Sequence, residues 1–234
     1  MKLFLLLLLS TSCFADNSCH KIRVAVIDSG LDLKDPRFTN YLCESGHKDF
    51  TGEGFKDFFV HGTHVAGLIQ QNAIDANYCF LIYKYYSIHV SGKQNLSREI
   101  SSIKYAIKNG ANVVNFSGGG AEFSEEEYDL IKNHPNVTFV VAAGNEGQDT
   151  DKVGNEYYPG SYWLDNIVIV GSTNHYGEKV QSSNWGNHIV WEVGDQVLST
   201  LPNGKNGYLS GTSMATAVRT GKLVDKLSKS CEYQ

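Results

Sequence analysis

Short apolar runs alternate along the chain with stretches in which apolar residues recur every three or four positions. Each run is rich in β-branched and aromatic residues. Its apolar residues follow one another without the polar–apolar alternation expected of a strand that exposes one face to solvent. The runs that we predict as strands are Lys21–Asp28, Phe80–Tyr86, Asn112–Phe116, Val137–Ala143 and Asn166–Val170, with a short one at Lys48–Thr51. Strands of this kind are typical of a parallel sheet that is covered on both faces.

The stretches between these strands carry the spacing of helices. One predicted helix begins after a cap at Ser97, places Ile100, Ile103 and Ile107 on one face, and ends at Gly110. A serine can accept a hydrogen bond from a free N–H of the first turn, and glycine readily takes the left-handed conformation that ends many helices. The apolar face of this helix would cover one side of the sheet.

A second helix is predicted after Ser124. Ser124 and Glu127 have the spacing of a capping box, Tyr128 and Ile131 follow as apolar positions, and Pro135 ends the pattern. Helices that alternate with parallel strands form βαβ units with right-handed crossovers. The expected fold class is therefore α/β, with a doubly wound, mainly parallel sheet and helices on both faces. In such sheets, ligands bind beyond the carboxyl ends of the strands.

Four motifs place reactive or polar side chains among small residues. VAVIDSG contains Asp28, HGTHVAG begins with His61, GTSMATA contains Ser213, and VVAAGNEG contains Asn145. An aspartate, a histidine and a serine are the side chains that make a serine hydroxyl nucleophilic. Their order along the chain is that of subtilisin, and the four motifs together resemble those of the subtilisin-like serine proteases. The resemblance extends over roughly Lys21–Leu227.

The resemblance implies a role for each of these residues. Ser213 would attack the peptide carbonyl, His61 would take its proton and return it, and Asp28 would orient the histidine. The side-chain amide of Asn145 and the backbone N–H of Ser213 would stabilise the oxyanion. The implied activity is that of a serine endopeptidase.

Other acidic and basic residues compete for two of these roles. His64 lies one helical turn after His61, but the zinc-protease pattern HExxH is absent because Gly-Thr separates the two histidines. In the family pattern the first histidine is the catalytic one, so we interpret His64 as structural. Asp32 and Asp35 would replace Asp28 only if the first strand ended later than predicted.

The substrate-binding residues are also implied by the resemblance. Ser117, Gly118 and Gly119 match the family segment that pairs with an extended polypeptide as an added strand. Ala143 and Gly144 would form the opposite wall of the pocket. The preference for particular side chains at the cleaved bond stays open.

The chain also departs from the family pattern. Ala217 stands where the family usually has proline, and 21 residues follow Ser213. The loop Gln71–Tyr78 lacks the asparagine-rich insertion that binds calcium in many relatives. We therefore expect a short form without a pro-domain, with no cofactor and no metal, that folds without calcium. These departures keep open an alternative function, that of an inactive or weakly active relative that binds peptides.

The amino terminus has the pattern of a secretory signal peptide. Lys2 supplies a positive start, Leu3–Leu9 an apolar core, and small residues lead to Ala15. We expect residues 1–15 to be the signal and residues 16–234 to form a single peptidase domain in a secreted or periplasmic protein. A lipoprotein cleaved before Cys13 is an alternative that the preceding Ser-Thr-Ser fits poorly.

The charge balance narrows the partners. The net charge is −5, and the chain has no basic run or basic–aromatic alternation. Nucleic acid and anionic membrane surfaces are therefore not expected partners. The expected protein is a monomer that acts on polypeptides.

Four cysteines remain after the predicted signal, which is typical of disulfides in an exported protein. From the predicted order of strands we expect the pairs Cys19–Cys231 and Cys43–Cys79, all at the amino-terminal edge of the sheet. The alternative joins Cys19 to Cys79 and leaves Cys43 with Cys231.

Overall fold

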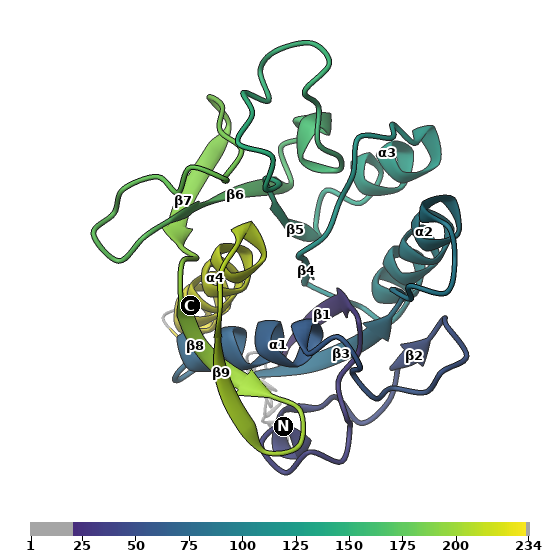
Figure 1. The fold of residues 1–234 in the computed structure, drawn as a ribbon. Helices are drawn as coiled ribbons and strands as arrows, with labels where there is room; N and C mark the ends of the chain where they lie inside the picture. The colour runs from purple at the N-terminus through teal and green to yellow at the C-terminus, as the bar shows by residue number, and fades with distance from the viewer. Residues whose placement is uncertain (1–20, 233–234) are drawn as a thin grey trace, which may run out of the picture.

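The computed structural model describes residues 21–232, and the side chains of residues 21–230. Its main feature is a seven-stranded sheet in which all neighbouring strands are parallel (Figure 1). The order across the sheet is β2-β3-β1-β4-β5-β6-β7. The strands are β1 Ile22–Asp28, β2 Lys48–Asp49, β3 Tyr78–Lys84, β4 Val113–Phe116, β5 Thr138–Ala142, β6 Ile167–Thr173 and β7 Ile189–Val193. The predicted doubly wound α/β fold is confirmed.

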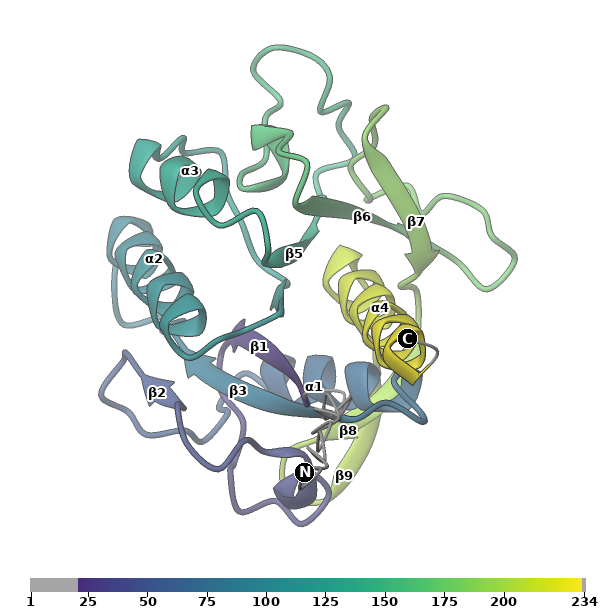
Figure 2. The same cartoon turned by 180° about the vertical axis from the view of Figure 1, so that it is seen from behind.

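Helices cover both faces of this sheet, and each face has its own apolar core. On one face α1 (His61–Asn72) and α4 (Thr212–Glu232) pack side by side against the sheet (Figure 2). On the other face lie α2 (Gly92–Lys108) and α3 (Glu125–Lys132). Two short 3-10 helices, η1 (Thr39–Tyr41) and η2 (Gly160–Tyr162), lie in the connections. This arrangement places the amino termini of α1 and α4 at the carboxyl edge of the sheet.

The start of α2 was predicted wrongly. The helix begins at Gly92, and its cap is Ser91, which accepts a hydrogen bond from the Gln94 N–H while the Gln94 side chain accepts from the Ser91 N–H. Ser97 lies inside the helix. The first turn is polar and begins with glycine, so the apolar spacing could not mark it. The predicted end at Gly110 agrees with the structure, because the helix ends at Lys108 and Gly110 has a φ of 69°.

The predicted capping box before α3 is only half formed. Ser124 does cap the helix, since its hydroxyl accepts a hydrogen bond from the Glu127 N–H. The Glu127 side chain does not return to the cap, however. It is buried and accepts a 2.8 Å hydrogen bond from the Tyr162 hydroxyl. The buried contact with Tyr162 therefore outweighs the tendency of Glu127 to cap its own helix.

A hairpin that the sequence analysis did not predict covers part of α1. It consists of β8 (Val197–Leu201) and β9 (Lys205–Leu209), and its turn has positive φ at Asn203 and Gly204. An Asn-Gly pair between alternating residues is the signal that could have revealed it. The Thr200 hydroxyl donates to the Thr63 carbonyl of α1, and a side chain at Gly67 would collide with Thr200. The glycine thus lets the hairpin approach the helix closely.

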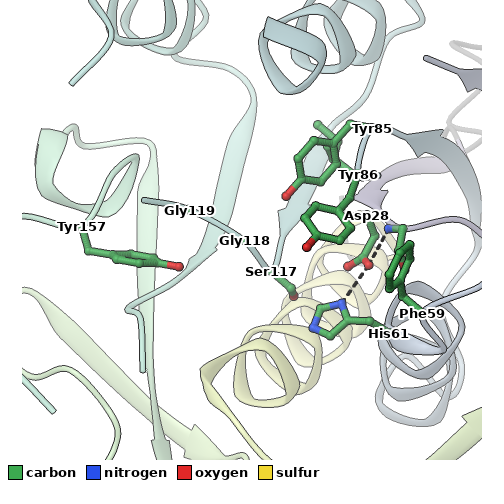
Figure 3. Close-up of a pocket in the computed structure, with 11 residues that line it drawn as sticks. Asp28, Phe59, His61, Tyr85, Tyr86, Ser117, Gly118, Gly119 and Tyr157 are labelled. Atoms are coloured by element: carbon green, nitrogen blue, oxygen red, sulfur yellow. Dashed lines mark hydrogen bonds and ion pairs between the residues drawn. The ribbon is translucent and has the colours of Figure 1, made fainter. Parts of the chain in front are cut away.

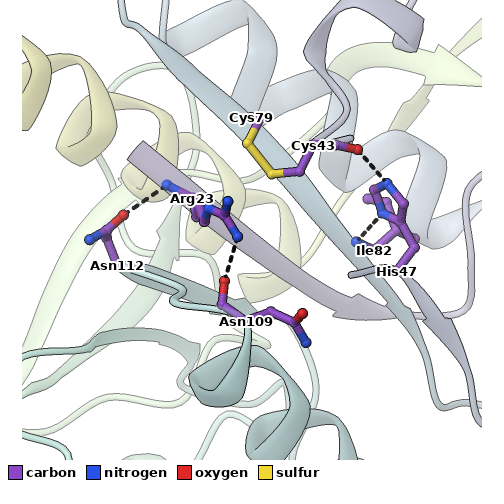
Figure 4. Close-up of a disulfide and its surroundings, with 7 residues drawn as sticks. All are labelled: Arg23, Cys43, His47, Cys79, Ile82, Asn109 and Asn112. Carbon is purple, nitrogen blue, oxygen red and sulfur yellow. Dashed lines mark hydrogen bonds between the residues drawn. A yellow bond between two sulfur atoms is a disulfide. The ribbon is translucent and has the colours of Figure 1, made fainter. Parts of the chain in front are cut away.

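One predicted disulfide is present in the described residues. Cys43 and Cys79 are joined, with their Cα atoms 5.0 Å apart, beside the amino half of β3 (Figure 4). The second predicted pair cannot be placed, because Cys19 and the side chain of Cys231 lie outside the described residues, as does the predicted signal at residues 1–15. Within the described chain, no helix has the length and apolarity needed to span a membrane.

Candidate active site

Three neighbouring strands end at the same edge of the sheet and bring the predicted residues to it. Asp28 is the last residue of β1, Ser117 follows β4, and Ala143 follows β5. A cavity of about 380 Å³ opens at this edge (Figure 3). Its lining consists of Ile27, Asp28, Ser29, Phe59, His61, Tyr85, Tyr86, Ser117, Gly118, Gly119 and Tyr157.

Asp28 and His61 form a direct pair in this cavity. The Asp28 Oδ1 atom lies 2.8 Å from His61 Nδ1, and the same oxygen accepts a 2.7 Å hydrogen bond from the Ser29 N–H. A carboxylate can only accept, so Nδ1 carries a proton and the neutral ring keeps Nε2 as its free basic nitrogen. Asp28 is buried, whereas a third of the His61 side chain is exposed. The pair can therefore take a proton from a group in the cavity.

The environment of His61 acts on its pKa in two directions. Burial lowers the pKa, because it disfavours the charged ring. The negative charge and hydrogen bond of Asp28, with a further contribution from the charge of Asp57, outweigh burial and raise the pKa above its usual value. His61 is thus a stronger base than an ordinary histidine, and its protonated form is stabilised by the carboxylate beneath it.

Asp57 is a residue of this region that the sequence analysis missed. One of its carboxylate oxygens accepts hydrogen bonds from the Ser29 hydroxyl and the Phe59 N–H, and the other from the N–H and hydroxyl of Thr63. Asp57 is buried and ties the first turn of α1 to the loop after β1. An aspartate shortly before a helix is a common cap, and that signal could have identified it.

Val60, directly before His61, has a backbone conformation that is costly for its residue type. Its φ is 60°, in the left-handed region that β-branched residues avoid. Such strain persists only where surrounding contacts fix the chain, and the hydrogen bonds of Asp57 on either side supply them. The strained turn directs the His61 side chain into the cavity.

Ser213 lies at the amino-terminal turn of α4, and its hydroxyl is hydrogen-bonded to a group other than His61. Its hydroxyl donates a 2.8 Å hydrogen bond to the Ser117 carbonyl, and the Ser117 hydroxyl donates back to the Ser213 carbonyl at 3.0 Å. None of the hydrogen bonds of the described residues joins Ser213 to His61, the base expected to take its proton. The cause is the Ser117 carbonyl, which lies just beyond the β4 ladder and takes the hydroxyl as its donor.

Asn145 is oriented by the residue before Ser213. Its side-chain oxygen accepts hydrogen bonds from the Thr212 N–H at 2.9 Å and from the Thr212 hydroxyl at 3.2 Å. A backbone N–H can only donate, so this contact fixes which end of the amide is oxygen. The NH₂ group consequently points away from Thr212 and is available to a ligand. The Ser213 N–H belongs to the first helical turn, where N–H groups have no partner within the helix.

Asn184 holds the loop that carries Asn145, and nothing in the sequence pattern indicated it. Its amide donates to the Ala143 carbonyl at 2.9 Å, and its oxygen accepts from the N–H groups of Glu146 and Gln148. The side chain is almost fully buried, with 1% exposed. A lone asparagine in a loop carries no signal for such a role, because its partners are distant in sequence.

Two tyrosines, also missed, shape the predicted peptide-binding segment. A side chain at Gly118 would lie 2.7 Å from the Tyr85 hydroxyl oxygen, and one at Gly119 would collide with the Tyr157 ring. Figure 3 shows Tyr157 across the two glycines from Tyr85. A side chain at Gly144 would likewise lie 2.9 Å from the Tyr157 ring.

The structure places only some of the residues expected to bind substrate on this cavity. Ser117, Gly118 and Gly119 line the cavity, but Ala143 and Gly144 are not among its lining residues. Tyr157 does line the cavity, and its ring would meet a side chain at Gly144.

The competing candidates lie outside the cavity. His64 is fully buried, its Nε2 lies 3.1 Å from the Gly207 carbonyl oxygen of β9, and burial lowers its pKa. Asp35 forms an ion pair with Arg37 at 2.6 Å, and Asp32 accepts a hydrogen bond from a backbone N–H in its own turn. None of these side chains reaches the cavity that contains Asp28 and His61.

Comparison with known proteins agrees with this geometry. The family model of the subtilase family matches residues 20–229. The major intracellular serine protease of Bacillus subtilis (strain 168) is 34% identical over an alignment of 233 positions that covers 91% of this chain and 70% of that protein. Subtilisin E of the same organism is 34% identical over an alignment of 218 positions that covers 89% of this chain and 56% of that protein.

A solved structure shows the same likeness. The crystal structure of a cold adapted subtilisin-like serine proteinase superposes with a TM-score of 0.75 at 28% identity, over 89% of this chain and 76% of that one. The chain thus spans little more than half of some relatives and about three quarters of others. On the match to the family model over nearly all described residues, the chain belongs to the subtilase family, the subtilisin-like serine endopeptidases.

Proposed function

We propose that this chain is a secreted serine endopeptidase that hydrolyses polypeptides through Asp28, His61 and Ser213. The observation that carries the proposal is the Asp28–His61 pair, which lies with a free Nε2 at the edge of the sheet where α4 presents Ser213. The oxyanion would be stabilised by the Asn145 amide and the Ser213 N–H.

The reaction follows from these groups. The Ser213 oxygen attacks the carbonyl carbon of the substrate while His61 Nε2 accepts the hydroxyl proton. Asp28 stabilises the imidazolium that forms, because its carboxylate already lies against Nδ1. The protonated ring then gives its proton to the leaving amine. Water repeats the sequence on the acyl-enzyme and releases the acid.

The hydrogen bond between Ser213 and Ser117 gives the substrate a further role. An extended peptide that pairs with the Ser117–Gly119 segment presents a backbone N–H to the Ser117 carbonyl. This N–H replaces the Ser213 hydroxyl as the donor, and the hydroxyl is then free to turn toward His61. Binding of substrate backbone and activation of the nucleophile are thereby coupled in this proposal.

Removal of the oxyanion donor gives the first prediction. Asn145→Ala should lower kcat by about 10²–10³-fold, the cost of losing this kind of donor in subtilisin, with KM little changed. The loss should be confined to kcat because the amide acts on charge that develops only in the transition state. Asn206→Ala, at an exposed asparagine of β9, is the matched control and should leave both constants unchanged. A purely KM effect of Asn145→Ala would argue for ground-state binding instead.

Secretion rests on this chain's own features, since the named relatives include an intracellular protease and a subtilisin. The predicted signal supports it, and so does the Cys43–Cys79 disulfide, a bond typical of oxidising compartments.

We therefore expect the exported protein to begin after Ala15 and to contain this disulfide. Because the bond closes a loop with a sequence separation of 36, the double variant Cys43→Ala and Cys79→Ala should lose about 3–4 kcal/mol of unfolding free energy. Urea unfolding measures the loss of stability, and counting free thiols measures whether the disulfide is present. Free thiols at both positions in exported protein, or unchanged stability of the variant, would contradict the prediction.

The alternative is a relative that binds extended peptides without cleaving them. The observation in its favour is that the Ser213 hydroxyl is held by Ser117 rather than by His61. Digestion of denatured casein by the wild type and by Ser213→Ala decides between the two. If the chain is a protease, the wild type produces casein fragments and the Ser213→Ala variant produces none. Peptide binding by both proteins, with no fragments from either, would establish the alternative.

A further inference from the structure

A second cavity, of about 320 Å³, adjoins the first on the side of α2. Tyr85, Tyr86 and Gly119 line both cavities, so the two share a wall. The second cavity extends from the peptide-binding glycines to the faces of α2 and α3 that pack against the sheet. Its other lining residues include Leu96, Glu99, Glu122, Glu127 and Tyr158.

Two of these residues are carboxylic acids buried against each other. Glu99 comes from α2 with 6% of its surface exposed, and Glu127 comes from α3 with 1% exposed. The Tyr162 hydroxyl donates to Glu127 Oε2, but Oε1 of Glu127 has no hydrogen-bond donor among the described residues. No lysine or arginine of the described chain forms an ion pair with either glutamate. The cavity thus holds two buried acidic groups without a counter-ion among the described residues, and the exposed Glu122 adds a third acidic group to its lining.

Two carboxyl groups buried side by side are costly to ionise together, and a cation bound between them would lower that cost. Burial, reinforced by the neighbouring Glu127, raises the pKa of Glu99 well above its usual value, and burial also raises the pKa of Glu127. Both shifts oppose ionisation of the pair. Helix packing alone requires no such pair, since apolar side chains of similar size would fill the same space at lower cost.

We propose that the second cavity binds a lysine or arginine side chain of the substrate, whose cation lies between Glu99 and Glu127. The proposal rests on the endopeptidase function above and adds a specificity to it. Because Gly119 borders both cavities, one extended peptide can place one side chain in each. The basic residue then lies at a fixed number of positions from the cleaved bond.

The walls of the second cavity suit an organic cation. Tyr86 and Tyr158 present aromatic rings, which attract ammonium and guanidinium groups, and Leu96 presents apolar surface to the methylene stem. No group of three or more histidine, cysteine, aspartate or glutamate side chains within the described residues could hold a metal ion. The chemistry therefore favours a basic side chain over a bound metal.

The test is a lysine scan. A quenched glutamine-rich peptide with one fixed cleavage site carries a single lysine, moved from six positions before the site to three after it. The wild type should cleave the lysine peptide at least about tenfold faster than the all-glutamine peptide, in kcat/KM, at one position only. Glu99→Gln and Glu127→Gln should each reduce this preference to less than about twofold.

Glu126→Gln is the matched control, because Glu126 is the exposed neighbour of Glu127 on α3 and pairs with Lys104 at the surface. It should keep the full lysine preference. Glutamine has the shape of glutamate and can still accept the Tyr162 hydrogen bond. Thermal unfolding should show that neither buried variant is less stable than the wild type.

A binding measurement separates this inference from the proposed function. In a Ser213→Ala background, the fluorescent lysine peptide should bind at least about tenfold more tightly than its glutamine counterpart, and Glu127→Gln should remove the difference. If no peptide is cleaved but this binding preference is found, the endopeptidase proposal fails and the basic-side-chain pocket stands. The inference is overturned if lysine improves neither cleavage nor binding at any position, or if the preference survives both glutamine variants.

Discussion

Replacing Ser213 with alanine is expected to reduce kcat by about 10⁶-fold, the loss that removal of the nucleophile causes in subtilisin. The reason is that the acyl-enzyme forms on the Ser213 hydroxyl, which alanine lacks. His61→Ala should cost nearly as much, because the serine is a weak nucleophile without its base. The double variant should then be scarcely worse than either single variant, since the two residues act as a unit.

Initial rates with a quenched peptide measure this prediction. Ser182→Ala, at an exposed serine outside the site, serves as the control and should keep wild-type kcat. If the reduction of kcat in the double variant equals the product of the two single reductions, Ser213 and His61 act independently. A Ser213→Ala protein with even about a tenth of wild-type kcat would mean that another nucleophile does the work.

The second large effect is expected for Asp28→Asn. The amide cannot stabilise the imidazolium and favours the wrong tautomer of His61, so kcat should fall by about 10⁴-fold, as it does in related triads. The pH profile should also move. Activity requires neutral His61, so kcat/KM rises as pH increases through its pKa.

The direction of the shift follows from the forces on His61. In the wild type, Asp28 overcomes burial and raises the pKa of His61, so the acid limb should lie above the usual histidine value of about 6.5. Without the Asp28 charge, burial dominates and the limb should move to lower pH. Profiles of kcat/KM between about pH 5 and pH 9 measure this. Asp32→Asn is the control and should leave the limb in place, whereas an unmoved limb in Asp28→Asn would contradict the assigned pairing.

Much of the framework was predictable because it depends on local patterns. The continuous apolar runs around Val24–Asp28 and Val137–Ala143 correspond to central strands, and strand ends in a parallel sheet determine where a site forms. The motif around His61 likewise located the start of a helix. What these predictions share is that each depends on neighbouring residues of the chain.

The parts that were missed depend on contacts between distant segments. Asn184 acts on a loop about forty residues away, and Asp57 acts on both the β1 loop and α1. The hydrogen bond from Ser213 to Ser117 arises because β4 ends one residue before that carbonyl, which no motif reveals. Glu127 had the sequence position of a capping residue, but tertiary packing placed its side chain in a cavity beside Glu99.

The central claim is that the Asp28–His61 pair activates Ser213, and labelling by a fluorophosphonate tests it most directly. The reagent reacts with an activated serine and not with an ordinary hydroxyl. Peptide mapping of the folded wild type should show one adduct, on Ser213, and the reaction should be lost in Ser213→Ala and strongly slowed in His61→Ala. A wild-type protein that stays unlabelled, or an adduct that forms as quickly in His61→Ala, would contradict the account.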